Sequence, residues 1–587
     1  MKNPHRLSRI AGIAALTLTV PAAGQTYSEL IREGDPLPGG TGELVTRIDN
    51  VDINGSGDWL VELDTDADNT ADAVVLFNGT VLWREGTSLG FTPPPGTEAG
   101  SFIDVLDIND AGDVMFTTPV RDVGTTSNGA TLLIWNGVTV IETGVTPCNA
   151  PGLPPGTIYD SVSEVWQNNN RELLVGARID SAGVTNNIML RVDLDALGNI
   201  VSETSLAMEG ETLPGPNHMT PIQGFSFSKG RQSINDNGES MWYVDDEHAT
   251  AGGSTLSDAN IYLTDSANVN TLLYNEADPF PTDPMDTFDH FSTAEIDLNN
   301  SGDFVFSGFD RGPSADDSWL FKSIGGVIEV IAHEGDPVPA AISGPWLIAG
   351  ASFGGIVPFS NNGDVLWFLD WDDPDTTIDT GLFFNDDLLL QEGVSMLGGL
   401  VVDDIPNSDS EIAMSDSGAF GIIEVVLEGD PAGDLDAVYV VELGGNIGTE
   451  YCPTNPNSTG ASGVLAATGS VTASDNDVTL VASSLPSVAF GYFITSETQG
   501  FIANPGGSEG NLCVSGSIGR YVGPGQVQNS GPDGSFSLVL DLTQTPTPGG
   551  FVPVVAGETR NYQAWHRDAG MSGPSSNLTN GVSISFN

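Results

Sequence analysis

Short runs of apolar residues, separated by tight polar turns, recur along the first three quarters of the chain. One turn has the pattern Asn-x-x-Gly-Asp, and successive copies begin 55 to 67 residues apart. No stretch sustains the 3.6-residue period of an amphipathic helix, so the pattern predicts an all-β protein. The seven copies of the turn begin at Asn54, Asn109, Asn168, Asn235, Asn299, Ser360 and Ser415.

The residue types of this turn suit a β-hairpin. Asn or Ser at its first position can bond its own backbone two residues on, and Gly at its fourth position tolerates a positive φ. Such a turn joins the first strand of each repeat to the second. The third copy has Arg171 where the others have Gly, so we expect the third repeat to be irregular.

Each repeat continues with two further apolar runs, which in the first repeat flank the hairpin signal Asn78-Gly79. A second marker then ends the repeat, and it reads Glu-Gly-Asp-Pro at 33–36 and at 334–337. We interpret its glutamates as turn residues rather than as a ring around a cation. Four strands in about 60 residues predict one blade of a β-propeller.

The two ends of the repeat region complement each other. The last repeat lacks its fourth strand and its closing marker, whereas residues 27–38 match the end of a repeat without its start. A strand from the N-terminal side would complete the last blade and leave no exposed sheet edge. The sequence therefore predicts a seven-bladed β-propeller over residues 25–445, with Tyr27–Arg32 as the outer strand of the last blade.

Residues 446–587 have a different pattern. Their alternating apolar runs are short and are separated by Gly, Ser and Pro, which predicts a C-terminal β-sandwich. Cys452 and Cys513 both lie in this segment, and we expect them to form a disulfide. Cys148 lies alone in a loop rich in Pro and Gly, and we expect it to be free.

Residues 1–24 have the features of a signal peptide: a basic start, an apolar run and the small residues Ala22-Ala23-Gly24 before a cleavage site. The apolar run is too short to span a membrane, and no Cys follows it as a lipid anchor would require. We therefore expect a secreted or cell-surface protein without membrane insertion. The formal net charge of −62 disfavours nucleic acid and anionic membranes as partners.

One acidic loop follows the second strand of the first repeat. Asp64, Asp66, Asp68 and Asp72 occupy its positions 1, 3, 5 and 9, and the carbonyl of Thr70 stands at position 7. Oxygen ligands at this spacing can converge on Ca²⁺. The loop is similar to the Asp-x-Asp-x-Asp-Gly-x-x-Asp loops of integrin-type propellers, so we expect a structural calcium ion here, with a solvated acidic loop as the alternative.

Catalytic motifs are scarce. The chain has no G-x-S-x-G elbow, no H-E-x-x-H and no P-loop. Two carboxylates meeting in the centre of a propeller could cleave a glycosidic bond, but sequence cannot select a pair among 79 acidic residues. In the C-terminal segment, Tyr562 and Trp565 could form a carbohydrate platform. The favoured interpretation is that both fill the core of the sandwich.

The repeated turn and the closing marker resemble those of uncharacterised secreted bacterial repeat proteins of planctomycete-like marine bacteria. The C-terminal segment, with its Tyr451-Cys452 and Leu512-Cys513 pairs, looks like a module attached to many exported proteins. These resemblances imply export and architecture and carry no catalytic residues. The sequence thus favours a secreted, non-catalytic propeller, calcium-stabilised, that binds carbohydrate or another extracellular protein. The alternative is a glycan-degrading hydrolase or lyase with carboxylates in the central cleft.

Overall fold

The computed structural model describes residues 25–586 except for 41, 102, 214–220, 226, 228–230, 247–257, 276–277, 280, 282–286, 292–294, 311–316, 350–356, 407–409, 430–433, 444–446, 453, 470, 472, 474–475, 477, 532–533 and 571–572. The expected signal peptide and the expected boundary at 445–446 have residues outside this set. Within the described ranges, helix is confined to two 3-10 turns, Pro505–Gly507 and Leu542–Gln544. The all-β prediction is confirmed.

The repeat region folds into seven antiparallel sheets, which we number 1 to 7 in chain order. Sheets 1 to 3 consist of β2 (Val45–Ile53), β3 (Trp59–Thr65), β4 (Ala73–Phe77) and β5 (Thr80–Arg84); β6 (Thr97–Ala99), β7 (Leu106–Ile108), β8 (Val114–Asp122), β9 (Asn128–Trp135) and β10 (Val138–Glu142); and β11 (Ile158–Gln167), β12 (Glu172–Ser181), β13 (Val184–Leu194) and β14 (Ile200–Met208).

Sheets 4 to 7 repeat this plan. They consist of β15 (Ile222–Gly224), β16 (Gln232–Ile234), β17 (Ser240–Asp246), β18 (Asp258–Thr264) and β19 (Asn270–Asn275); β20 (Phe288–His290), β21 (Ile296–Leu298), β22 (Phe304–Asp310), β23 (Ser318–Ile324) and β24 (Val327–His333); β25 (Leu366–Asp370), β26 (Thr380–Phe384) and β27 (Asp387–Gln391); and β28 (Met396–Leu397), β29 (Leu400–Asp404), β30 (Ile412–Met414), β31 (Phe420–Leu427), β32 (Leu435–Glu442) and β1 (Tyr27–Arg32).

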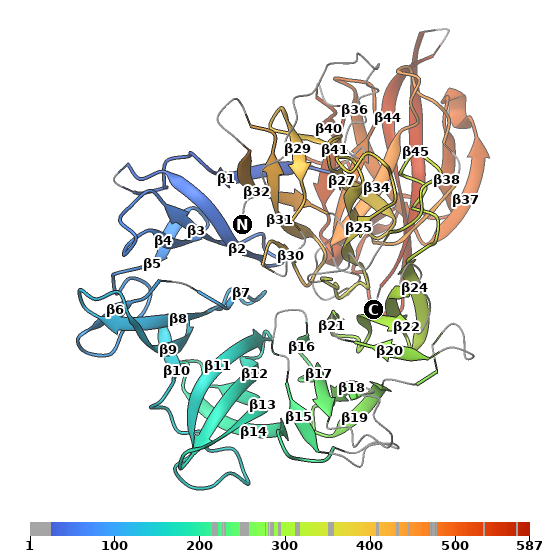
Figure 1. Ribbon diagram of the computed structural model, residues 1–587. Helices are drawn as coiled ribbons and strands as arrows, with labels where there is room; N and C mark the ends of the chain where they lie inside the picture. The colour runs from blue at the N-terminus through green and yellow to red at the C-terminus, as the bar shows by residue number, and fades with distance from the viewer. Residues whose placement is uncertain are drawn as a thin grey trace.

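The first strand of the chain completes the last sheet of the repeat region. β1 pairs antiparallel with β32, with Tyr27 opposite Val441 and Arg32 opposite Ala437. Figure 1 shows sheets 1 to 5 following one another around a common centre, with β7, β16, β21 and β30 innermost. This propeller-like arrangement places the seven Asn-x-x-Gly-Asp turns near one axis.

A hydrophobic core lies between each sheet and the next. Six clusters join successive sheets from 1 to 7. The seventh cluster joins the last sheet to the first, because Ile422 and Val438 of sheet 7 pack with Val61 and Val74 of sheet 1. Each sheet is therefore covered on both faces, which explains why its middle strands are almost continuously apolar.

The third repeat is regular, and the expected irregularity at Arg171 is wrong. Arg171 adopts φ 66°, the conformation that Gly supplies in the other turns, and its carbonyl accepts a hydrogen bond from the backbone N–H of Leu194 at 2.9 Å. The packing of a complete four-stranded sheet thus holds a non-glycine residue in the left-handed region.

Two glutamates of the closing marker, Glu85 and Glu334, form bonds within the sheets. Glu85 and Glu334 are buried at the ends of their sheets rather than solvated. Glu85 pairs with the buried guanidinium of Arg121 at 2.6 Å, and Glu334 accepts a hydrogen bond from the Ser318 hydroxyl at 3.2 Å. Glu334 thus bonds a residue of its own sheet, and Glu85 bonds a residue of the next sheet. Both glutamates therefore have a structural role.

The C-terminal segment contains two antiparallel sheets around one core. Phe493 and Tyr562 of the first sheet pack with Leu480 and Phe536 of the second. The strands are β33 (Thr449–Tyr451), β36 (Phe490–Ser496), β39 (Gly519–Arg520), β40 (Gln528–Asn529), β44 (Thr559–Gly570) and β45 (Gly573–Ser585) in the first sheet; β34 (Val464–Gly469), β35 (Val478–Ser483) and β41 (Phe536–Val539) in the second; and the pairs β37 (Thr498–Ala503) with β38 (Asn511–Ser515) and β42 (Thr545–Thr547) with β43 (Gly550–Val552).

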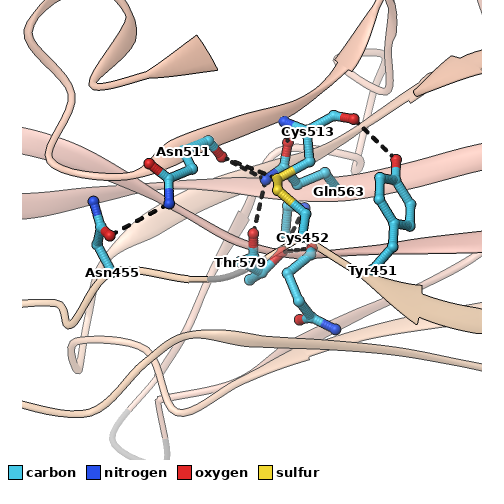
Figure 2. The surroundings of a disulfide bond; sticks show 9 residues. Tyr451, Cys452, Asn455, Asn511, Cys513, Gln563 and Thr579 are labelled. Carbon is cyan, nitrogen blue, oxygen red and sulfur yellow. Dashed lines mark hydrogen bonds between the residues drawn. A yellow bond between two sulfur atoms is a disulfide. The ribbon is translucent and has the colours of Figure 1, made fainter. Parts of the chain in front are cut away.

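A disulfide joins Cys452 to Cys513, with 6.1 Å between their Cα atoms. Figure 2 shows the buried side chain of Gln563 beside it. Gln563 accepts from the backbone N–H of Cys513 and donates to the carbonyls of Asn511 and Thr579, so it links β44 to β38 and β45. Cys148 is buried and free.

The expected place of Trp565 in this core is wrong. Tyr562 lies in the core, but Trp565 packs on the opposite face of the sheet, 5.0 Å from the ring of Tyr492. Residues three apart on a strand face opposite sides, which accounts for the difference.

Candidate functional site

Side-chain hydrogen bonds join the first six of the Asn-x-x-Gly-Asp turns in succession around the axis. The side-chain Nδ2 of Asn54 donates to the carbonyl of Asn109 at 3.1 Å, and Asn109 donates in the same way to Asn168 at 3.0 Å. The series continues from Asn168 to Asn235, Asn299 and Ser360, at 2.8, 2.9 and 3.2 Å. We call this series the turn ring.

Each asparagine of the turn ring also shapes its own turn. The Oδ1 atom of Asn235, for example, accepts from the backbone N–H groups of Asn237 and Glu239 at 3.0 and 2.9 Å. At the sixth turn the hydroxyl of Ser360 accepts from Asn362 and Asp364 in the same pattern. Serine thus retains the turn but has no amide to donate to the next repeat.

The second residue of the turn adds another layer of bonds between repeats. Asp236 accepts from the backbone N–H of Asn169 at 2.8 Å, and Asn300 accepts from that of Asp236 at 2.7 Å. At the seventh turn the side chain of Asp416 accepts no described hydrogen bond, and its backbone carbonyl accepts from the N–H of Asn361 at 2.6 Å. The Asp416 carboxyl is therefore available to a ligand.

Two residues before the turn, aspartates connect neighbouring inner strands. Asp52 Oδ2 accepts from the backbone N–H of Ile108 at 2.7 Å, and Asp297 Oδ2 accepts from that of Phe359 at 2.9 Å. Asp297 Oδ1 also accepts from the Ser233 hydroxyl at 2.7 Å. These carboxylates are fixed in position by the repeats on either side.

A cavity of about 100 Å³ lies inside the ring and is lined by residues of all seven repeats. One water molecule needs a cavity volume of about 10–15 Å³, so this cavity has room for several water molecules. Among the described residues that line it, none is Lys, Arg or His. The acidic residues of the lining are Asp52, Asp107, Glu164, Asp236, Asp297 and Asp416.

The crowding of carboxyl groups changes their ionisation. Loss of hydration raises the pKa of Asp297 to about 6, despite its hydrogen bonds from Ser233 and Phe359. Loss of hydration also raises the pKa of Asp416 well above its usual value, and the charges of Asp110 and Asp297 raise it further. The Asp416 residue is exposed, and it lies on the lining of the cavity among residues of the other repeats. The shift in the pKa of Asp416 favours its protonated form.

The predicted calcium loop lies at the outer side of sheet 1, away from this cavity. The carbonyl of Thr70 accepts a hydrogen bond from the Arg121 guanidinium at 2.7 Å, and Asp66 accepts one from the backbone N–H of Leu44 at 2.8 Å. Asp64 is the penultimate residue of β3, and the carbonyl of Asp72 accepts a hydrogen bond from the backbone N–H of Thr65 at 3.0 Å. Asp68 accepts from the Thr70 hydroxyl at 2.9 Å. Calcium binding by this loop remains a prediction.

The residue type and the immediate sequence neighbours of Asp297 and Asp416 do not distinguish them from the other acidic residues. The available signal is their place relative to the turn: two residues before its first position and one residue after it. Because the turns converge on the axis, the residue two before the turn lines the cavity in every repeat, and the residue after its first position does so in the last four repeats.

Comparison with known proteins places the chain in a family. The profile of a family of unknown function, DUF7453, matches residues 14–404. The chain belongs to this family. The match ends before the C-terminal segment, and neither the expected marine-bacterial origin nor the expected exported module receives support from it. No curated protein sequence matches the chain.

Solved structures show distant likeness. A crystal structure of polysaccharide lyase Uly1 is 10% identical and covers 67% of this chain and 89% of its own, with a TM-score of 0.35. An α-L-arabinanase of Penicillium chrysogenum is 13% identical and covers 71% and 99%, with a TM-score of 0.27. A protein of unknown function from Dyadobacter fermentans is 10% identical and covers 72% and 100%, with a TM-score of 0.29.

Across the described residues, no helix is long and apolar enough to cross a membrane.

Proposed function

We propose that this protein is a secreted glycan-degrading enzyme, a hydrolase or lyase, whose carboxyl groups act in the axial cavity. The observation that carries the proposal is Asp416, a carboxyl with a raised pKa and no described side-chain hydrogen bond, facing a cavity to which every repeat contributes. A protonated acid in a cleft is what cleavage of a glycosidic bond needs in a proton donor. This replaces the non-catalytic function that the sequence favours.

The proposal includes the architecture that forms the cavity: a closed seven-bladed propeller followed by a β-sandwich. The pairing of β1 with β32 and the core shared by sheets 7 and 1 support closure. The turn ring supports it as well, because bonds between successive turns draw the inner strands together around one axis.

The residues of the cavity have distinct roles in this proposal. Asp416 protonates the leaving oxygen. Asp236 is the candidate base or nucleophile, since the side-chain amides of Asn169 and Asn300 donate to its Oδ2 atom at 2.9 and 2.8 Å and hold the carboxyl group in position. The indole N–H of Trp166, also on the lining, has no described partner and can donate to a sugar hydroxyl.

The test is release of sugar from a panel of polysaccharides by the wild-type protein, by Asp416→Asn and by a matched control. Asp386→Asn removes one charge from an exposed hairpin far along sheet 6 and leaves the axis unchanged. The proposal expects release by the wild type and Asp386→Asn and at least a hundredfold less by Asp416→Asn, in line with loss of a general acid (about 10²–10⁴-fold). Equal release by all three would overturn the role of Asp416.

The small volume of the cavity, about 100 Å³, favours a second candidate function. In that case the protein is a secreted, non-catalytic binder of carbohydrate or of another extracellular protein. Retention of the protein on a polysaccharide without release of sugar would support it. A structural calcium ion in the loop of Asp64, Asp66, Asp68, Thr70 and Asp72 is compatible with either function.

A further inference from the structure

A pair of glutamates lies where the last sheet meets the first. Glu424 is in β31, and Glu411 directly precedes β30. The backbone N–H of Glu424 donates to the carbonyl of Glu411 at 2.8 Å, continuing the pairing of Ile412 with Ile423. The two residues are thus direct cross-strand neighbours, so their side chains project from the same face of sheet 7.

The first repeat has the same pair of positions but a different chemistry. Asn50 and Glu62 are cross-strand partners of β2 and β3. The Asn50 amide donates to the Glu62 carboxylate, and the backbone N–H of Ile103 donates to its other oxygen at 3.1 Å. In the last repeat Glu411 stands where the first has Asn50, four residues before the turn, so a carboxyl replaces the amide donor.

Glu424 is nevertheless deeply buried. Its exposed fraction is 5%, and among the described residues its Oε2 atom accepts no hydrogen bond. A buried carboxyl oxygen without a donor is destabilising, and more so when the group is charged. A bound proton or cation would give the Oε2 atom of Glu424 a partner.

The surrounding charges are mainly negative. Asp49 of β2 and Asp436 of β32 face the pair together with one cation, Arg47 of β2. Arg47 is largely exposed and already pairs with Asp49 at 2.6 Å. Asp404 of β29 also feels the charge of Glu411. The negative charges at this junction attract a cation. Among the described residues, no lysine and no second arginine lies nearby to neutralise them.

We propose that Glu411 and Glu424 bind a calcium ion that fastens sheet 7 to sheet 1. Nowhere in the described part of the chain do three acidic, Cys or His side chains converge as a complete cage, so water completes the shell around the two glutamates. Calcium accepts six to eight oxygens and tolerates such irregular shells. A site with two protein carboxylates belongs to the weak class found in extracellular modules, with Kd on the order of 10⁻⁴–10⁻³ M.

The experiment titrates calcium into the chelator-treated, full-length protein and follows both heat of binding and Tm. Glu411→Asn recreates the Asn50–Glu62 pair of the first repeat, so it should fold without the ion. Glu424→Gln is a second variant, since its amide can donate to Glu411. Paired substitution of Asp66 and Asp68 by Asn separates this site from the loop in sheet 1.

The proposal expects the wild-type Tm to rise by roughly 5 °C at calcium about 100 times Kd. This rise should disappear in Glu411→Asn and in Glu424→Gln and persist in the paired loop variant. In chelator, Glu411→Asn should melt above the wild type. Two results would overturn the proposal. One is a calcium response that Glu411→Asn leaves intact. The other is stabilisation by acid, without calcium, that is present in the wild type and absent in Glu411→Asn, which would mean that the two glutamates share a proton.

Discussion

The side-chain Nδ2 of Asn54 lies 3.1 Å from the carbonyl oxygen of Asn109, 55 positions later in the chain, and donates a hydrogen bond to it. Four further turns make the same bond to their successors. A residue that closes its own hairpin thus also holds the next repeat at a fixed distance. The axial cavity and the position of its carboxyl groups follow from this ring.

Substitutions at Asn235 separate the two roles of a turn-ring asparagine. Asn235→Ser keeps an oxygen for the turn, as Ser360 does, but removes the bond to Asn299, and should lower the free energy of unfolding by about 1–1.5 kcal/mol. Asn235→Ala removes both and leaves buried donors without partners, so its loss should be about 2–4 kcal/mol. Urea denaturation measures both. Unchanged stability in Asn235→Ser would contradict a bond between repeats that adds to the turn's own bonds.

Arg171→Gly should stabilise the protein by about 1 kcal/mol, because Gly adopts the observed φ of 66° without the steric cost that Arg bears. The carbonyl of residue 171 keeps its bond to Leu194 in the variant. Gly112→Arg, at the equivalent place in the second turn, is the reverse change and should destabilise by a similar amount. A loss of stability in Arg171→Gly would show that contacts of the arginine side chain stabilise the fold by more than its positive φ destabilises it.

Asp297 should make stability depend on pH. Its pKa is about 6 in the folded protein and near 3.8 in the unfolded chain, so the folded state retains a proton that the unfolded state loses. Its contribution is complete below about pH 4 and is lost as pH rises through 6, a change of about 3 kcal/mol.

The variant Asp297→Asn isolates this contribution, since it does not titrate. The difference in unfolding free energy between wild type and variant should shift by that amount between pH 4 and pH 6 and then level off. A difference that stays constant over this range would mean that Asp297 titrates normally in the fold.

Calcium binding by the loop of sheet 1 has its own test. If Asp64, Asp66, Asp68, Thr70 and Asp72 hold an ion, substitution of Asp66 and Asp68 by Asn should remove one calcium-dependent rise in Tm. The Thr70 carbonyl must then release Arg121, so Arg121→Lys should alter the calcium affinity as well. An unchanged calcium response in the paired variant would leave the loop as a solvated acidic segment.

Local chemistry predicted much of the fold. The turn at Asn235 could be inferred from its residue types, because the bonds from Oδ1 to Asn237 and Glu239 lie within five residues. The bond from its Nδ2 to Asn299 could not, since it depends on how two sheets pack. For the same reason the role of Arg171 was misjudged: tertiary packing supplied the conformation that its side chain disfavours.

The candidate site was harder to predict than the fold. Asp416 is one carboxyl among many, and its pKa is raised first by loss of hydration and then by the charges of Asp110 and Asp297, which come from other repeats. Trp565 was misplaced for a simpler reason, since its distance from Tyr562 along the strand puts it on the other face.

The most direct test of the account is sugar release from polysaccharides by the wild-type protein and by Asp416→Asn, with folding of both checked by their melting curves. The account predicts that the wild type releases sugar and that Asp416→Asn, equally folded, releases at least a hundredfold less. Binding to a polysaccharide without release of sugar by the wild type would contradict it and would make the protein a non-catalytic binder.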